Sequence, residues 1–187
     1  MDATLPSVTT ILTRVGLAPD FRFVPEDTLE RARVRGKALH RAIYLLDKGT
    51  LDRRGLHPDL VGGLAAYEAF VAQTGHQAIA SEIELIHPRW RFCGHPDRIG
   101  VHRGSQRAIF DWKMTRSYDA RYVPIQLAAY RMLWNATHKE EPVELCIGVH
   151  LRRDGTFGLH ELADPEAEQK FMAALIVYRE LEARGSL

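Results

Sequence analysis

The residues best suited to chemistry lie in the middle of the chain. Asp111 and Lys113 end an apolar run at residues 108–110, and Asp97 lies in the preceding strand-like run. Because alternate side chains of a strand share a face, Asp111 and Lys113 should point the same way, with Trp112 turned to the other side. A hairpin can bring Asp97 beside Asp111. Two carboxylates and an ammonium at one sheet edge predict a site for a hard divalent cation and an activated water.

Each of these three residues has an expected role. Mg²⁺ prefers a few carboxylate oxygens and keeps several waters, so we expect Asp97 and Asp111 to be metal ligands. A water near both the metal and Lys113 can lose a proton and act as a nucleophile. The ammonium of Lys113 would orient that water and help to lower its pKa, or stabilise the negative charge that develops during the attack.

Further motifs stand on either side, in a fixed order along the chain. The set is Arg35-Gly36-Lys37-Ala38-Leu39-His40, Gly94-His95-Pro96-Asp97, Asp111-Trp112-Lys113 and Gln126-Leu127-Ala128-Ala129-Tyr130. This set resembles the RecB-like branch of the PD-(D/E)XK nuclease superfamily, over roughly residues 40–130. The N-terminal segment, residues 6–17, is similar to the start of phage- and prophage-encoded exonucleases of that group.

The resemblance implies additional metal ligands. The matching histidine, His40, contributes to the metal site in that group, and the backbone carbonyl of Trp112 joins the expected ligand set. A nitrogen ligand among oxygens also suits Mn²⁺. Gly36, one turn before His40, would permit close approach of helix and sheet. Glu82 and Glu84 share a face of an expected strand on which relatives often carry a glutamate. We favour Glu82, although a solvated face would explain both residues.

The fourth motif falls on a helix. Gln126 and Tyr130 are four residues apart and therefore share a helix face. The resemblance places Gln126 near the attacking water or the scissile phosphate, and Tyr130 near the DNA backbone or a base. Met114 departs from the group, in which Thr or Ser often follows the lysine. The candidates for phosphate or stacking contacts with DNA are Arg35, Lys37, Arg116, Tyr118 and Arg121.

The elements that must position these residues follow from hydrophobic periodicity. Helical spacing predicts helices at about 7–17, 26–47, 58–74, 120–137 and 165–184. Alternation and turn residues predict strands at 78–87, 90–102, 107–114, 143–153 and 156–162, with the run 90–102 interrupted by Gly94 and Pro96. This order predicts an α/β (α+β) fold with a mixed central sheet of about five strands flanked by helices. The resemblance implies a restriction-endonuclease-like core. We expect one domain, 1–187, with a mostly helical N-terminal part at 1–75 and the nuclease core at 76–187.

Composition excludes several classes of protein. The net charge of +1 and the hydrophobic fraction of 45% are ordinary, and no apolar run is long enough to span a bilayer. The N-terminus lacks the pattern of a secretory signal, so we expect a cytoplasmic protein without a membrane partner. The two cysteines, Cys93 and Cys146, are expected to be core thiols. They cannot supply the four ligands of an iron–sulfur cluster, and the scattered histidines do not form a zinc motif.

The sequence therefore predicts a metal-dependent DNA exonuclease that uses Mg²⁺, with Mn²⁺ as a substitute. Its partner is DNA, with single- or double-stranded ends, and the resemblance suggests a recombination or single-strand-binding protein as a further partner. The alternatives are a non-catalytic DNA-end-binding or adaptor module, a structure-specific endonuclease, and a hydrolase of RNA or a small phosphoester. The presence of Asp97, Asp111 and Lys113 together argues against the adaptor.

Overall fold

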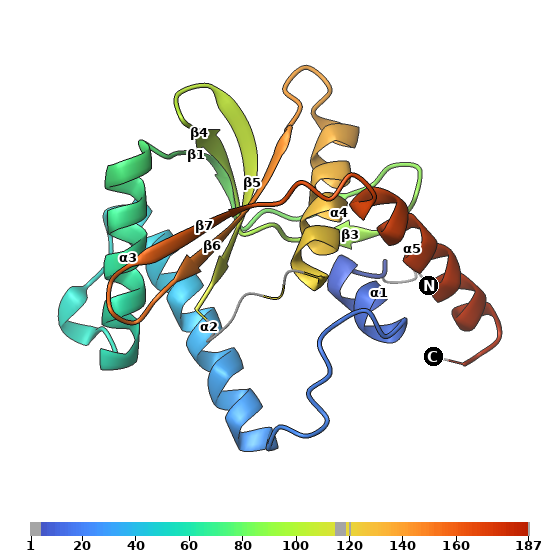
Figure 1. Cartoon of the computed structure of the whole chain (residues 1–187), viewed down its shortest axis with the longest axis horizontal. Helices are drawn as coiled ribbons and strands as arrows, with labels where there is room; N and C mark the ends of the chain where they lie inside the picture. Colours follow the sequence, from blue (N-terminus) through green and yellow to red (C-terminus); the bar gives the residue numbers. More distant parts are fainter. Residues whose placement is uncertain (1–4, 115–118, 120, 187) are drawn as a thin grey trace.

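The structure, a computed structural model, describes residues 5–114, 119 and 121–186. Five α-helices and seven strands are found in these residues (Figure 1). The helices are α1 (Val8–Arg14), α2 (Glu26–Asp47), α3 (Pro58–Thr74), α4 (Tyr122–Thr137) and α5 (Ala167–Ala183). The strands are β1 (Gln77–Ser81), β2 (Leu85–Ile86), β3 (Cys93–Gly94), β4 (Arg98–His102), β5 (Gln106–Lys113), β6 (Leu145–Leu151) and β7 (Phe157–Glu161).

A five-stranded mixed sheet forms the centre of the fold. Its strand order is β1-β4-β5-β6-β7, and β2 pairs with β3 in a separate two-stranded sheet. The pair β5–β6 is parallel, whereas β1–β4, β4–β5 and β6–β7 are antiparallel. Helix α4 forms the crossover between the two parallel strands. The predicted mixed sheet of about five strands flanked by helices is confirmed.

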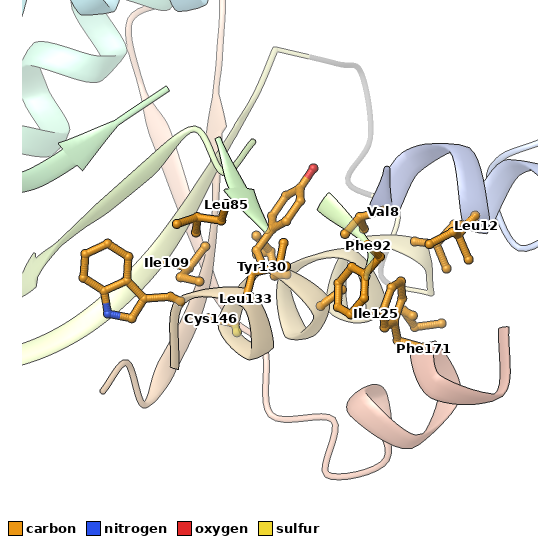
Figure 2. Packing of buried hydrophobic residues seen from close by; sticks show 14 of the residues in the cluster. Val8, Leu12, Leu85, Phe92, Ile109, Ile125, Tyr130, Leu133, Cys146 and Phe171 are labelled. Atoms are coloured by element: carbon orange, nitrogen blue, oxygen red, sulfur yellow. The ribbon is translucent and has the colours of Figure 1, made fainter. Parts of the chain in front are cut away.

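Helices cover both faces of the sheet, and the pleat of β5 contributes to both cores. Phe110 and Trp112 pack on the side of α2 and α3, whereas Ile109 packs on the side of α4. Figure 2 shows the second core, in which Tyr130 and Leu133 of α4 lie near Ile109. Since Phe110 is fully buried, its truncation to alanine should cost about 3–5 kcal/mol. This alternation directs Asp111 and Lys113 away from Trp112, as predicted.

The helix boundaries follow local chemistry. The Ser7 side chain accepts a hydrogen bond from the backbone N–H of Thr10 at 3.1 Å and caps α1, an interaction that contributes about 1 kcal/mol. Gly75 follows α3 with φ of 64°, a left-handed conformation that glycine adopts without a steric penalty. The predicted bounds of the second and third helices, 26–47 and 58–74, agree with α2 and α3.

One of the predicted strands is wrong in its continuity. The run 78–87 divides into β1 and β2 because Glu82 has a φ of 50°, which an extended strand cannot accommodate. The backbone N–H of Glu82 donates to the carbonyl of Asp97 at 3.3 Å, which holds this bend against the next segment. Glu82 and Glu84 therefore do not share a strand face. The run 90–102, by contrast, was predicted to be interrupted at Gly94 and Pro96, and it divides there into β3 and β4.

Two smaller expectations are settled by packing. A Cβ at Gly36 would meet no atom within 4 Å, so the expected close approach of helix and sheet at this glycine is wrong. Cys93 and Cys146 are buried free thiols, as predicted. Among the helices that the structure describes, none is both long and apolar enough to cross a membrane.

Candidate active site

Three potential metal ligands converge from separate elements. His40 lies on α2, Glu82 lies in the bend after β1, and Asp97 directly precedes β4. One ligand atom from each lies within 4.8 Å of the others. The Nδ1 atom of His40 is 3.3 Å from Oδ1 of Asp97 and 3.5 Å from Oε1 of Glu82. The bend at Glu82, which sequence periodicity missed, is what turns this carboxylate toward His40.

The backbone of β5 fixes Asp97 and His40 at the same point. Oδ2 of Asp97 accepts a hydrogen bond from the backbone N–H of Trp112 at 2.8 Å. The carbonyl oxygen of Trp112 lies 3.4 Å from Nε2 of His40. The predicted ligands His40 and Trp112 carbonyl are therefore neighbours, and one peptide group on each side of Trp112 contacts the cluster.

Asp111 and Lys113 form a second, adjoining pair. The Nζ atom of Lys113 donates to Oδ1 of Asp111 at 2.8 Å. Among the described residues, the other oxygen of Asp111, Oδ2, is buried without a hydrogen-bond partner. The potential ligand set therefore consists of His40, Glu82 and Asp97. Asp111 adds one unsatisfied oxygen beside this set. A buried carboxylate oxygen without a donor is a position that a cation can satisfy.

The charges of the cluster balance one another. Burial alone would raise the pKa of Asp97, but His40, Lys113 and the Trp112 amide together hold it below its usual value. Burial raises the pKa of Asp111 to about 6, against the opposing effect of Lys113. Burial would lower the pKa of Lys113, yet Asp111 and Asp97 raise it. Lys113 is therefore an ammonium at neutral pH and acts as a hydrogen-bond donor.

His40 carries a proton in the absence of a metal. Burial lowers its pKa, but the carboxylates of Asp97 and Glu82 outweigh burial and raise the pKa to about 10. The imidazolium thus supplies a positive charge beside the two carboxylates. Oxygen donors from carboxylates and a carbonyl, with one imidazole nitrogen, suit Mg²⁺ and Mn²⁺. The residues present fit a divalent cation.

The fourth motif lies inside the protein. Gln126 and Tyr130 are buried on α4, and Nε2 of Gln126 donates to the Tyr130 hydroxyl at 3.2 Å. Burial raises the pKa of Tyr130, and the charges of Asp97 and Asp111 raise it further, which places the phenol within the field of the carboxylates. The side-chain amide oxygen of Gln126, Oε1, is buried without a hydrogen-bond partner among the described residues. It is an unsatisfied acceptor one helical turn from Tyr130.

The predicted DNA contacts divide into three groups. Arg35 and Lys37 line a hollow of about 260 Å³ together with His40 and Lys113, so they lie beside the cluster. Arg121 is exposed immediately before α4. Arg116 and Tyr118 lie outside the described residues.

One supporting network was missed by sequence reasoning. Arg98, the residue after Asp97, is 2% exposed, and its guanidinium forms an ion pair with Asp47 at the end of α2. It also donates to the hydroxyl of Tyr67 at 3.2 Å, and that hydroxyl donates to Oδ1 of Asp47 at 2.8 Å. The ring of Trp112 lies 5.7 Å from the guanidinium. An arginine that opens an apolar strand was the only sequence signal of this network.

This mixed sheet, with acidic residues and a lysine at the end of a central strand, defines a class of metal-dependent hydrolases of phosphodiester bonds. The model of the PD-(D/E)XK nuclease superfamily matches residues 54–173. The chain belongs to this superfamily, whose members are nucleases that use divalent metal ions. The matched segment contains Glu82, Asp97, Asp111 and Lys113, whereas His40 precedes it. The predicted superfamily is confirmed.

Two solved structures with TM-scores above 0.5 agree with this fold. The alkaline exonuclease LHK-Exo from Laribacter hongkongensis matches with a TM-score of 0.45 and 16% identity over 64% of this chain; the match spans 64% of the length of that chain. The structure of LHK-Exo in complex with dAMP matches with a TM-score of 0.51 and 14% identity, over 96% of this chain and 89% of that one. A candidate exonuclease from Eubacterium rectale matches with a TM-score of 0.53 and 11% identity, over 95% of this chain and 74% of that one. No curated protein matches the chain.

Proposed function

We propose that this protein is a metal-dependent deoxyribonuclease that hydrolyses phosphodiester bonds from DNA ends. The observation that carries the proposal is the junction of two clusters. His40, Glu82 and Asp97 form the potential metal site. The Asp111–Lys113 ion pair adjoins this site, because the backbone N–H of Trp112, between these two residues, donates a hydrogen bond to Asp97. A cation site beside a charged lysine is the arrangement that attack of water on a phosphodiester needs.

The cation would be held by His40, Glu82 and Asp97, with the free oxygen of Asp111 completing the set, while the carbonyl of Trp112 orients the imidazole through Nε2. Mg²⁺ is the proposed ion, and Mn²⁺ suits the imidazole ligand equally well. When bound, such an ion stabilises charge on phosphoryl oxygens and makes a nearby water more acidic.

The chain's own residues perform the remaining tasks. Asp111 holds the ammonium of Lys113 by a 2.8 Å hydrogen bond, so that its other N–H bonds can donate to the attacking water or to a phosphoryl oxygen. The hydroxyl of Tyr130 accepts the amide N–H of Gln126, which leaves the Gln126 carbonyl free to accept a hydrogen bond from that water. Tyr130 is thus a positioning residue for Gln126, rather than a contact for a base.

Attack at DNA ends is supported by the kind of contacts available. Arg35, Lys37 and Arg121 offer charge to backbone phosphates without reading sequence. In the described residues, we find no zinc finger or similar added module that would read base edges. LHK-Exo, with a similar fold, is an alkaline exonuclease whose structure was solved with dAMP.

The test compares linear DNA with a covalently closed circle of the same sequence, in Mg²⁺ and in excess EDTA. We expect the linear DNA to disappear progressively only in Mg²⁺, while the circle persists, and Asp97→Asn should abolish digestion. Discrete fragments from the circle would instead identify an endonuclease. Binding of DNA ends without cleavage in any divalent metal would identify an adaptor module.

A further inference from the structure

A second hollow adjoins the metal cluster at His40 and Glu82. It has a volume of about 450 Å³ and is lined by Lys37, His40, Arg41, Tyr44, Ser81 and Glu82. This volume falls in the range of roughly 300–1,000 Å³ that is typical of small-molecule pockets. Lys37 and His40 also line the smaller hollow beside Lys113. The two hollows therefore meet at Lys37 and His40, next to the potential metal site.

One face of α2 supplies most of this pocket. Lys37, Arg41 and Tyr44 follow one another at helical spacing, so their side chains project from the same stripe. Ser81, the last residue of β1, and Glu82, in the bend after it, form the opposite wall. The bend at Glu82 therefore shapes the pocket as well as the metal cluster.

The pocket contains acidic and cationic side chains. Glu82 interacts with His40 in the metal cluster. Among the residues that the structure describes, Lys37 and Arg41 form no ion pair, in contrast to Arg33 on the same helix, which contacts Glu26 and Glu30. These two unpaired cations are available to an anion.

An aromatic ring stands beside Arg41. The guanidinium carbon of Arg41 lies 5.2 Å from the centre of the Tyr44 ring, and Nζ of Lys48 lies 5.8 Å from it. Aromatic rings and guanidinium planes both stack on nucleobases without regard to sequence. Phosphate-binding cations beside a stacking surface are typical of sites for single-stranded nucleic acid.

We propose that this pocket binds one nucleotide of a single strand next to the bond that is cleaved. Lys37 and Arg41 contact its phosphate, Tyr44 stacks on its base, and the Ser81 hydroxyl supplies a further hydrogen bond. The inference rests on the proposed nuclease function and adds to it a subsite that is independent of base sequence. The strand then crosses the metal site from this pocket to the hollow that contains Arg35 and Lys113.

The test measures the binding of a fluorescent, nuclease-resistant phosphorothioate oligothymidine by anisotropy, in Mn²⁺ and over a range of salt concentrations. The double variant Lys37→Gln/Arg41→Gln should bind about tenfold more weakly, and its salt slope should fall by about 0.7, the contribution of one neutralised phosphate on a single strand, because both side chains contact the same phosphate. Tyr44→Leu should also weaken binding by about tenfold, whereas Tyr44→Phe should not, because the ring is retained. The matched control is Arg107→Gln, which removes a charge paired with Glu141 at the far end of β5.

Mn²⁺ affinity, measured by calorimetry on the same proteins without DNA, should stay within about twofold of the original protein. Unchanged DNA binding and salt slope in the double variant would overturn the pocket, even if the original protein digests DNA. A loss of Mn²⁺ affinity equal to the loss of DNA binding would overturn it as well, since the residues would then act on the metal site. An original protein that neither binds nor cleaves DNA would overturn the proposed function together with the pocket.

Discussion

The imidazole of His40 and the carboxylate of Asp97 lie 3.3 Å apart and connect α2 to the start of β4. This contact joins the helical N-terminal part of the chain to the sheet at the site itself. Without a cation, the pair is an imidazolium facing a carboxylate, because Asp97 and Glu82 raise the pKa of His40 to about 10 despite its burial. The same proton must leave when His40 becomes a metal ligand.

The first prediction concerns the stability of the metal-free protein at alkaline pH. The pKa of His40 is about 10 in the folded state and about 6.5 when unfolded. Its contribution is therefore fully present below pH 6.5 and is lost as the pH rises toward 10. In EDTA, urea unfolding should show a loss of about 1–3 kcal/mol between pH 7 and pH 9.5. His40→Gln should lack this component, and an equal loss in both proteins would assign the pH dependence to other groups.

The second prediction separates Glu82 from Glu84. Glu82 lies 3.5 Å from His40, whereas Glu84 is an exposed residue outside the three-residue cluster. Glu82→Gln should weaken Mn²⁺ binding at least about tenfold, as is usual when a ligand or its close support is removed. Glu84→Gln, which removes the same charge nearby, should leave the affinity within about twofold. Titration calorimetry of both variants measures the difference, and equal losses would mean that only overall negative charge matters.

Most of the fold was predictable from sequence because local signals and tertiary packing agree. Ser7, Gly75 and the apolar stripes of α2 and α3 fix helices whose ends depend on neighbouring residues. The site was predictable in its residue types from the strand alternation around Asp111. What could not be predicted depends on contacts distant in sequence. The bend at Glu82 is held by the Asp97 carbonyl, and alternation alone made Glu82 and Glu84 look equivalent.

The third prediction concerns Lys113. Its ammonium is held by Asp111 at 2.8 Å and remains charged because Asp111 and Asp97 raise its pKa against burial. Lys113→Ala should reduce the rate of DNA hydrolysis roughly 10²–10⁴-fold, the usual contribution of one positioned proton-handling group. Its Mn²⁺ affinity should not fall, since a positive charge beside the site is removed. Hydrolysis at nearly the original rate would show that the lysine has no catalytic part.

The last prediction uses the buried ion pair beside the site. Arg98 is 2% exposed, whereas the side chain of Asp47 is 26% exposed. Removing the acid leaves a buried charge without its counterion, so Asp47→Asn should lower the free energy of unfolding by about 3–5 kcal/mol. Arg98→Met removes the buried charge itself and fills its place with an apolar chain, so its cost should be smaller. The double variant should therefore be more stable than Asp47→Asn alone, because the second change removes the unpaired guanidinium. Urea unfolding of the original protein, the two single variants and the double variant gives this double-mutant cycle. Additive losses in the free energy of unfolding would show that Asp47 and Arg98 act independently and do not connect α2 to β4.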